Sequence, residues 1–276
     1  MRIVITGGSG GVGRATVRAA VDGGHTVLSL DRVEPKPEDV VAGVDYRVLD
    51  LTDYDSLVAA LNGWEAIIHL GAIPNPINTP DHVTHNNNVV SSYNAMRGAI
   101  EVGIKRICQA SSINAIGGAW SRQAHYDYLP VDEKHPTYNE DPYSLSKWIC
   151  EQQGDSLARR FEDVRIASMR FHWVVPNRDV PIQLQAKIGR PVTMHLWGYT
   201  LFSSAADACL RAVTTATYLG HEVFYIVERE TAMTVPTAEL LKEFWPAIPV
   251  RGEIIGNSSL FDCSKAGRLL GWVSAA

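Results

Sequence analysis

The feature that most constrains the fold is a glycine-rich loop near the start of the chain. Residues 2–6 have the apolar pattern of a buried strand, residues 6–13 read TGGSGGVG, and a helical pattern follows to about residue 22. Glycine allows a tight turn and lets backbone N–H groups at a helix N-terminus approach a phosphate. A flexible loop has the same composition, but a strand before it and a helix after it are the context of a dinucleotide-binding loop. The loop residues expected to hold the cofactor are Gly7, Gly10, Gly11, Val12 and Gly13.

The rest of the first 170 residues alternates apolar runs with helical patterns. This alternation predicts a parallel sheet with helices on both faces, the doubly wound α/β arrangement of the Rossmann type. We therefore expect a dinucleotide-binding domain over residues 1–170. Residues 171–276 are less regular and are expected to form a small C-terminal substrate cap, parts of which return to the sheet. The expected strands are residues 25–30, 46–49, 66–70, 106–110, 164–170 and 223–227, and the expected helices are residues 53–61, 81–102, 142–161, 204–217 and 237–244.

Composition and charge exclude several classes of protein. The 276 residues carry a formal net charge of −5 and contain no run of lysine or arginine. A nucleic-acid partner needs a basic face, so that class is set aside. No apolar run is long enough to span a membrane, and the first residues lack the layout of a signal peptide. The cysteines have neither metal-ligand nor redox-motif spacing, so we expect no metal, reduced thiols and a cytoplasmic location.

An acidic residue at the end of the second expected strand bears on the choice of dinucleotide. Asp31 follows Gly13 by 18 residues (31 − 13). A carboxylate near this distance accepts hydrogen bonds from the ribose hydroxyls of NAD and repels the 2′-phosphate of NADP. The neighbouring Arg32 argues the other way, because a guanidinium pairs well with phosphate. We assign both residues to the cofactor site and expect NAD rather than NADP.

Tyr143 and Lys147 are four residues apart in a helical pattern, so they lie on one face of that helix. Oxidation of an alcohol requires loss of its hydroxyl proton as the hydride leaves. A phenol with a pKa near 10 is a poor base at neutral pH, and a nearby ammonium favours the phenolate. The alternative is an exposed tyrosine–lysine pair without a role. Because a loop beginning with Ser111 and Ser112 precedes the pair, we predict that Tyr143 is a catalytic base supported by Lys147 and a serine hydroxyl.

The order of these motifs resembles that of the extended short-chain dehydrogenases/reductases, and more narrowly that of the NAD-dependent epimerase/dehydratase family. Residues 88–94 read NVVSSYN and are similar to that family's helix motif N-x-x-G-T-x-N. The similarity extends over nearly the whole chain and is specific through Arg170. The segments that carry it are TGGSGGVG, Asp31, residues 50–51, residues 69–72, Ser111-Ser112 and Tyr143-x-x-x-Lys147.

The resemblance implies roles for further residues. Ser112, rather than Ser111, is implied as the catalytic hydroxyl. Tyr143 and Lys147 are implied to lie at the nicotinamide end of the cofactor as well as at the reacting carbon. The residues that it adds to the cofactor site are Asp50, Leu51, Leu70, Gly71, Ala72 and Asn88.

Three departures from the family pattern bear on the substrate. Ile113-Asn114 stands where dehydratases carry an acidic pair, and Ser203-Ser204 stands where many nucleotide-sugar members have Arg-Asp. The segment after Lys147 is also short for a cap that grips a nucleotide diphosphate. The layout is similar to uronate dehydrogenases, although their Asn-His after the catalytic serine is absent here. The substrate-binding residues expected from position are Asn75, Ser112, Asn114, His172 and Arg178.

These observations favour an NAD-dependent oxidoreductase that moves a hydride between nicotinamide and a sugar or sugar acid. The alternative enzyme is a nucleotide-sugar 4-epimerase, which uses the same pair to oxidise and then reduce one carbon. A third interpretation, a non-catalytic dinucleotide-binding regulator, is disfavoured because the tyrosine–lysine pair is retained. Family members commonly dimerise through the helices near residues 81–102 and 142–161. These helices carry more apolar side chains than a sheet-facing stripe uses, so we expect a homodimer; the additional residues are Val89, Val90, Met96 and Trp148.

Overall fold

A computed structural model describes residues 1–188 and 191–275 of the chain. Its centre is a seven-stranded parallel sheet with the strand order β3-β2-β1-β4-β5-β6-β9. The chain runs from β1 outward to β3 and then returns to β4 on the other side of β1, so the order reverses between β1 and β4. Ligands of such sheets bind beyond the carboxyl ends of the strands at this reversal. The strands are β1 (Arg2–Thr6), β2 (Thr26–Asp31), β3 (Asp45–Val48), β4 (Ala66–His69), β5 (Arg106–Ser112), β6 (Arg165–Phe171) and β9 (Gly220–Ile226).

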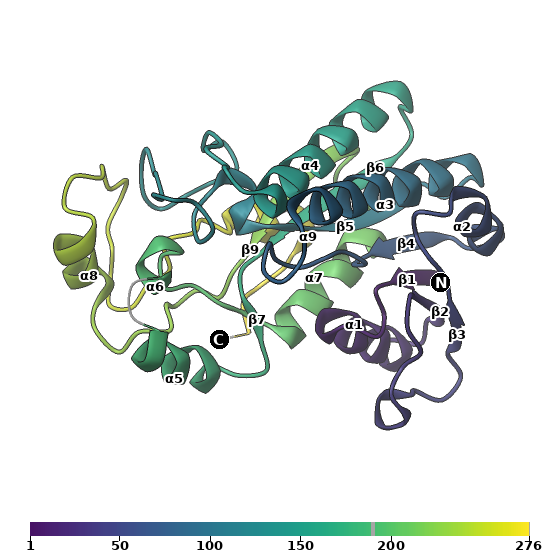
Figure 1. Cartoon of the computed structure of the whole chain (residues 1–276), viewed down its shortest axis with the longest axis horizontal. Helices are drawn as coiled ribbons and strands as arrows, with labels where there is room; N and C mark the ends of the chain where they lie inside the picture. The colour runs from purple at the N-terminus through teal and green to yellow at the C-terminus, as the bar shows by residue number, and fades with distance from the viewer. Residues whose placement is uncertain (189–190, 276) are drawn as a thin grey trace.

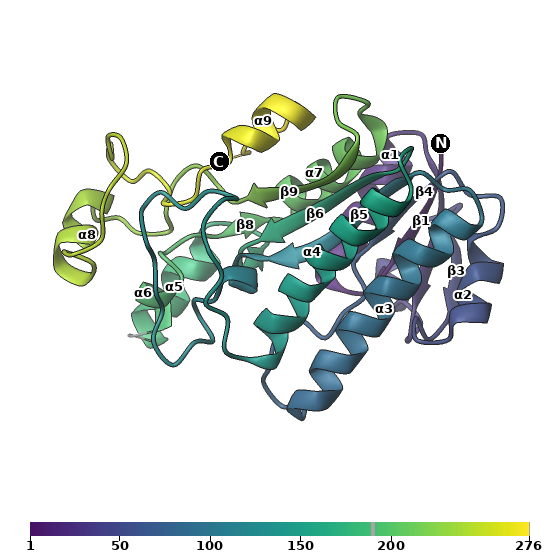
Figure 2. The same cartoon turned by 90° about the horizontal axis from the view of Figure 1, so that it is seen from above.

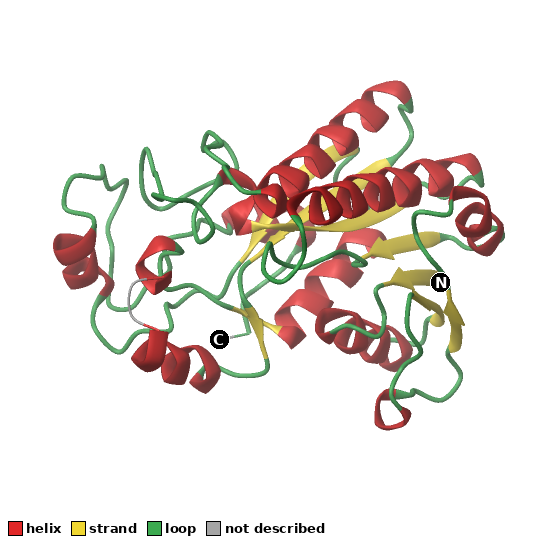
Figure 3. Cartoon of the chain, viewed as in Figure 1, coloured by secondary structure: helices red, strands yellow, loops and turns green. Residues whose placement is uncertain are grey.

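Helices cover both faces of the sheet (Figures 2 and 3). Successive side chains of a strand point to opposite faces, so Ile3 and Ile5 pack under α1 and α7 while Val4 packs under α2, α3 and α4. Both cores consist of buried, mainly aliphatic side chains, which explains why the strands read as continuous apolar runs. The Rossmann-type α/β fold expected from the sequence is confirmed. The covering helices are α1 (Gly11–Asp22), α2 (Tyr54–Leu61), α3 (Asp81–Glu101), α4 (Pro142–Arg160), α7 (Phe202–Thr214) and α9 (Ser264–Leu270).

A smaller layer lies beyond the carboxyl ends of β5, β6 and β9, on the left of Figure 1. Its own core includes Leu129, Trp197, Leu240 and Phe261, contributed by segments far apart in the sequence. The loop before α4 is held there by backbone hydrogen bonds, such as that from Val131 N to Leu260 O at 2.8 Å. The elements are η2 (Ile113–Ile116), α5 (Asp179–Ile188), α6 (Pro191–Met194), β7 (Val174–Val175), β8 (Thr200–Leu201) and α8 (Thr237–Phe244); a further short turn, η1 (Pro37–Asp39), follows β2.

The structure refines the expected element boundaries in the C-terminal third. β9 begins three residues earlier than expected, and α7 begins at Phe202 and ends at Thr214. Helix α5 was not expected because Pro181 interrupts the pattern, but this proline lies in the first turn, where no helical N–H is required. Both α7 and β9 belong to the sheet layers although they follow residue 170. The division of the chain at that residue therefore stays an expectation.

Candidate active site

The glycine-rich loop joins β1 to α1 in a conformation that side chains would prevent. Gly7 has a φ of +71°, and a Cβ there would lie 2.6 Å from Gly71 N. A Cβ on Gly13 would lie 2.0 Å from Gly7 O, so this glycine lets α1 begin directly against the strand end. The N-terminus of α1 therefore faces the carboxyl edge of the sheet, where its unpaired N–H groups suit a phosphate.

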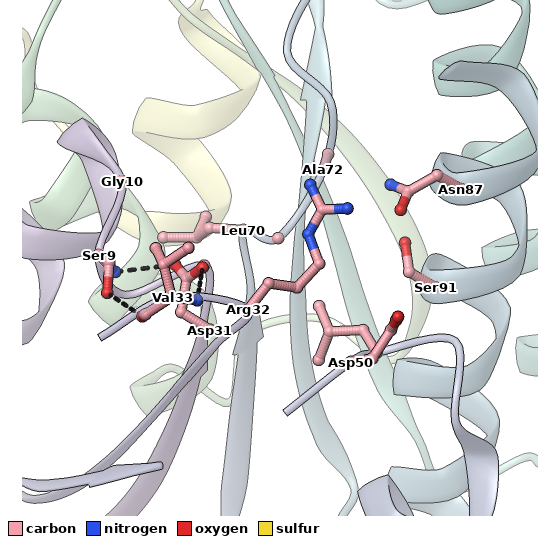
Figure 4. A pocket seen from close by; sticks show the side chains of 13 residues that line it. Ser9, Gly10, Asp31, Arg32, Val33, Asp50, Leu70, Ala72, Asn87 and Ser91 are labelled. Carbon is pink, nitrogen blue, oxygen red and sulfur yellow. Dashed lines mark hydrogen bonds between the residues drawn. The ribbon is translucent and has the colours of Figure 1, made fainter. Parts of the chain in front are cut away.

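A cavity of about 250 Å³ opens beside this loop at the strand-order reversal. Asp31 lies at its edge, where one carboxylate oxygen accepts a hydrogen bond from Ser9 N at 2.9 Å (Figure 4). Arg32 extends from the same strand end toward Ala72 and Asn87, across the cavity from Asp31 (Figure 4). The residues lining the cavity are Gly7, Ser9, Gly10, Asp31, Arg32, Val33, Asp50, Leu51, Leu70, Gly71, Ala72, Asn87 and Ser91.

Most of the expected cofactor residues therefore line one surface, but Asn88 does not. Its side chain is buried and bonds the backbone of Ile73 twice, accepting from N at 2.8 Å and donating to O at 3.0 Å. It also donates to Ser146 Oγ at 3.1 Å. Asn88 thus ties the segment after β4 to α4, while its neighbours on α3, Asn87 and Ser91, face the cavity.

The predicted catalytic residues converge at the ends of β5 and α4. Burial raises the pKa of Tyr143 to about 12, and a hydrogen bond with Ser112 opposes this shift. Burial also lowers the pKa of Lys147, whose ammonium donates to Ala110 O at 2.7 Å and lies 5.9 Å from the centre of the Tyr143 ring. The three side chains can hold an oxygen of a ligand, exchange its proton and stabilise the resulting charge.

The structure distinguishes the two adjacent serines at the end of β5. Ser111 Oγ donates to Glu151 Oε1 at 2.6 Å, so its hydroxyl proton is already used. Ser112 Oγ instead accepts from Asn114 N at 3.1 Å, which leaves its proton free to donate. The geometry therefore favours Ser112 as the hydroxyl that bonds a reacting oxygen, in agreement with the resemblance.

A second cavity, of about 750 Å³, contains these catalytic groups. Asn75, Asn114 and His172 line it as expected. Trp120, Trp173 and His195 also line it, which no sequence motif predicted. These three follow different strands or helices, and only the tertiary fold brings them together. The lining residues are Gly11, Val12, Leu70, Ala72, Pro74, Asn75, Ile77, Ala110, Ser111, Ser112, Ile113, Asn114, Ala119, Trp120, Tyr143, Lys147, Phe171, His172, Trp173, Val174, His195 and Phe202.

Arg178, the expected partner of a substrate carboxylate, lies outside this lining. Its guanidinium bonds Glu230 Oε2 at 2.9 Å and the carbonyl oxygens of Thr231 and Met233 at 2.9 and 3.2 Å. These partners engage Nη1 and Nη2, while the buried Nε bonds none of the described residues, so a two-pronged contact with a carboxylate would have to displace them. The position of Arg178 therefore gives no support to a role in substrate binding.

The two cavities fit an extended dinucleotide. Both are lined by Leu70 and Ala72, so they meet at the end of β4. Gly10 faces the first cavity and Gly11 the second, which places the N-terminus of α1 at the junction, where a pyrophosphate would lie. A dinucleotide bound in this way would have its adenosine end near Asp31 and its nicotinamide end near Tyr143 and Lys147.

Known proteins are similar to this chain in sequence and in fold. The sequence model of the NAD dependent epimerase/dehydratase family matches residues 3–189. The L-arabinose 1-dehydrogenase (NAD(P)(+)) of Haloferax volcanii is 29% identical over 185 residues, 65% of this chain and 69% of the relative. A putative UDP-glucose 4-epimerase of Methanocaldococcus jannaschii is 30% identical over 189 residues, 65% of this chain and 58% of the relative, which is under two thirds of its length. A mutated uronate dehydrogenase has a similar fold, with a TM-score of 0.71 at 22% identity over 100% of this chain and 82% of that chain.

The fold and the site together define a Rossmann-type enzyme that uses NAD. The chain belongs to the NAD dependent epimerase/dehydratase family, among the extended short-chain dehydrogenases/reductases. The predictions of the family and of NAD as cofactor are confirmed. Within the described residues, no helix is both long and apolar enough to cross a membrane.

Proposed function

We propose that this enzyme transfers a hydride between NAD and a sugar or sugar acid, as a dehydrogenase. The observation that carries the proposal is the convergence of Tyr143, Ser112 and Lys147 in a cavity that adjoins the dinucleotide cavity. Two of the proteins that this chain resembles are named as dehydrogenases of a free sugar or uronate. The retained catalytic pair speaks against a non-catalytic regulator.

The chemistry proposed for the chain's own residues is a proton transfer at the substrate oxygen. NAD, when bound, accepts the hydride from the carbon that carries this oxygen. Tyr143 takes the hydroxyl proton as the carbon–oxygen double bond forms, and Ser112 holds the oxygen by a hydrogen bond. Lys147 stabilises the phenolate that accepts the proton, because its ammonium lies beside the ring. In the reverse direction, Tyr143 returns the proton to a carbonyl oxygen.

The second candidate is a nucleotide-sugar 4-epimerase, which the resemblance to a putative UDP-glucose 4-epimerase favours. The two functions differ in the fate of the cofactor. A dehydrogenase releases one NADH for each sugar oxidised, whereas an epimerase reduces its own intermediate and shows no net redox change. Screening free sugars, sugar acids and UDP-sugars for NADH release, with sugar analysis of the products, separates them. Turnover confined to UDP-sugars without NADH would reject the dehydrogenase.

We also propose that the enzyme is a homodimer that pairs through α3 and α4, which pack side by side (Figure 2). Val83, Val90 and Tyr93 lie on one face of α3 and are exposed, as is Leu145 on α4. Exposed apolar side chains on two adjacent helices suit burial against a second copy. Met96, by contrast, is fully buried toward the sheet. Light scattering of the wild type and of Val90→Glu tests this: the wild type is expected as a dimer and the variant as a monomer.

A cytoplasmic location is part of the same proposal. Cys108, Cys150 and Cys209 are buried free thiols, and Cys263 is a half-buried one. Free thiols are typical of proteins kept in a reducing compartment. Cell fractionation with detection of the protein tests the location.

A further inference from the structure

The second cavity has large apolar side chains at its surface. Ile77 is 50% exposed, Trp120 36% and Trp173 39%, although burial is usual for such side chains. Exposed apolar groups gathered around one cavity mark a surface that a ligand covers. The indole faces of Trp120 and Trp173 and the side chain of Ile77 suit the C–H face of a sugar ring, or another uncharged apolar surface, better than a solvated ionic group.

The polar groups of the described lining are mainly neutral amides, hydroxyls and imidazoles. Lys147 is the charged side chain among them, and its ammonium already donates to Ala110 O beside Tyr143. The amide oxygen of Asn75 accepts a hydrogen bond from Ile77 N at 2.9 Å. Its two amide N–H groups donate to none of the described residues and can bond a ligand. These groups can bond the hydroxyl oxygens of a sugar, but among the described lining residues they add no charge to balance a carboxylate or phosphate.

The titratable groups of this cavity all shift toward their uncharged forms. Burial lowers the pKa of His172 to about 3 and that of His195 to about 4, and it lowers the pKa of Lys147. Burial raises the pKa of Tyr143 to about 12. The same desolvation acts on any charge that a ligand carries into the cavity. An ionic substrate would therefore lose its hydration without gaining a matched partner.

The two histidines that line the cavity differ in whether their ring nitrogens bond other residues of the protein. His172 donates from Nε2 to His195 O at 2.9 Å and accepts from Trp173 N at 2.6 Å through Nδ1. The His195 ring stands edge-on to it, with centroids 5.0 Å apart, and its buried Nδ1 bonds none of the described residues. Its Nε2 bonds none of the described residues either, and the cavity is lined by this side chain. His195 can therefore donate to a ligand hydroxyl through Nε2 when this nitrogen carries the ring proton.

We infer that the substrate is an uncharged aldose, with its ring face against Trp120 and Trp173 and a hydroxyl accepting from His195, rather than a uronate, sugar phosphate or nucleotide sugar. This inference rests on the proposed hydride transfer at Tyr143, and it chooses among the substrates that the proposal leaves open. The charged alternatives require a cation in the cavity, and Arg178 is bonded elsewhere.

Sugars that differ in charge alone test the inference. The Tyr143→Phe variant with bound NAD is titrated calorimetrically with galactose and galacturonate, and with glucose and glucose 6-phosphate, since this variant binds without turnover. The neutral member of each pair is expected to bind at least about tenfold more tightly. The inference is overturned if the charged member of either pair binds more tightly than the neutral member. It is also overturned if neither sugar of a pair binds. The ratio of kcat/KM for the same pairs on the wild type gives the same decision if the variant does not fold.

The outcomes separate this inference from the proposed function. If the variant binds neutral sugars but the wild type neither releases NADH nor epimerises them, then hydride transfer is rejected and the neutral site stands. If the wild type oxidises the uronate in preference to its aldose, then hydride transfer stands and the neutral site is rejected.

His195 is tested by a separate pair of variants. His195→Ala is expected to raise KM for the preferred aldose about tenfold with little change in kcat, because the donor is used in binding. His195→Gln, which keeps an N–H donor, is expected to restore most of the loss. His82→Ala on the exposed face of α3 is the matched control and should change neither constant. An unchanged KM in His195→Ala overturns the role of this residue.

Discussion

The first cavity is lined by Asp31, Arg32 and Asp50, whereas the second is lined by indoles, aliphatic side chains, amides and neutral imidazoles. In the first, hydrogen bonds from Thr52 lower the pKa of Asp50, so that carboxylate stays charged. In the second, burial shifts Tyr143 and Lys147 toward their neutral forms. Under the proposed function, the first region binds an ionic cofactor through fixed charges, and the second removes water around the reacting groups.

This difference suits the first and second cavities, which lie at the same edge of the sheet, to different functions. Charged side chains near solvent give selectivity for the ribose and phosphate groups of a dinucleotide. Electrostatic interactions are stronger in a site that excludes water, so one ammonium beside a phenol has more effect there than at the surface. The following predictions test the comparison from the largest expected effect to the smallest.

Removal of the Tyr143 hydroxyl should have the largest effect. Tyr143→Phe is expected to lower kcat by about a hundredfold or more, because the proton loses its acceptor. The dissociation constant of NAD should change little, since the first cavity is untouched. Steady-state kinetics and NAD titration measure both. Tyr138→Phe, at an exposed tyrosine that bonds Asp127, is the control. Near-normal turnover in Tyr143→Phe would exclude it as the base.

A methyl group on Gly13 should disrupt the junction of the two cavities. Its Cβ would lie 2.0 Å from Gly7 O, so Gly13→Ala is expected to lower the free energy of unfolding by about 2 kcal/mol and to weaken NAD binding. Gly267→Ala is the control, because the nearest atom to its Cβ would be 3.6 Å away. Denaturant unfolding compares the two. Equal stability of both variants would contradict the close packing of α1 on the loop.

The pH dependence of the reaction rate tests the ionisation of Tyr143 in the second cavity. The pKa of Tyr143 is raised to about 12 in the free protein, and Tyr143 acts as a base only when deprotonated. The rate of sugar oxidation should therefore rise with pH, by at most about tenfold per unit, whereas the reverse reduction, which needs the protonated phenol, should stay nearly constant below the pKa. Initial rates between about pH 6 and about pH 10 measure this. An oxidation rate that falls as the pH rises would contradict the role of Tyr143.

Substitution in the first cavity should have the smallest effect on catalysis. Asp31→Ala is expected to weaken NAD binding about fivefold and to relax discrimination against NADP, because the ribose hydroxyls lose a charged acceptor. The value of kcat at saturating NAD should change little. Asp22→Ala, at an exposed carboxylate at the end of α1, is the control. Tighter binding of NADP than of NAD by the wild type would show that Arg32 dominates.

The first cavity could be predicted from the sequence because its signals are local. The glycine spacing, the acidic strand end and the alternation of strands and helices each lie within short segments, and the parallel sheet fixes where they meet. Tyr143 and Lys147 were predictable for the same reason, since one helical turn joins them. Asn88 shows the limit: its motif suggested the cofactor, but its side chain bonds the backbone of Ile73 and the hydroxyl of Ser146.

The second cavity was harder to predict because its walls come from distant segments. Trp120, Trp173 and His195 have no spacing that links them, and the cap core that places them joins residues from 113 to 261. Arg178 looked available as the next cation after β6, but Glu230 and two carbonyl oxygens bind it in the folded chain. A residue's partners across the fold cannot be deduced from its place in the sequence.

The most direct test of the central claim is to follow the hydride itself. The enzyme is incubated with NAD and aldoses that carry deuterium at every carbon-bound position, and the cofactor is examined by mass spectrometry and NMR. The account predicts deuterated NADH free in solution, with the deuterium on one face of the nicotinamide ring, and no transfer by Tyr143→Phe. A sugar that is converted while its deuterium appears in water or stays on the sugar, with no label in the cofactor, would contradict hydride transfer between the two cavities.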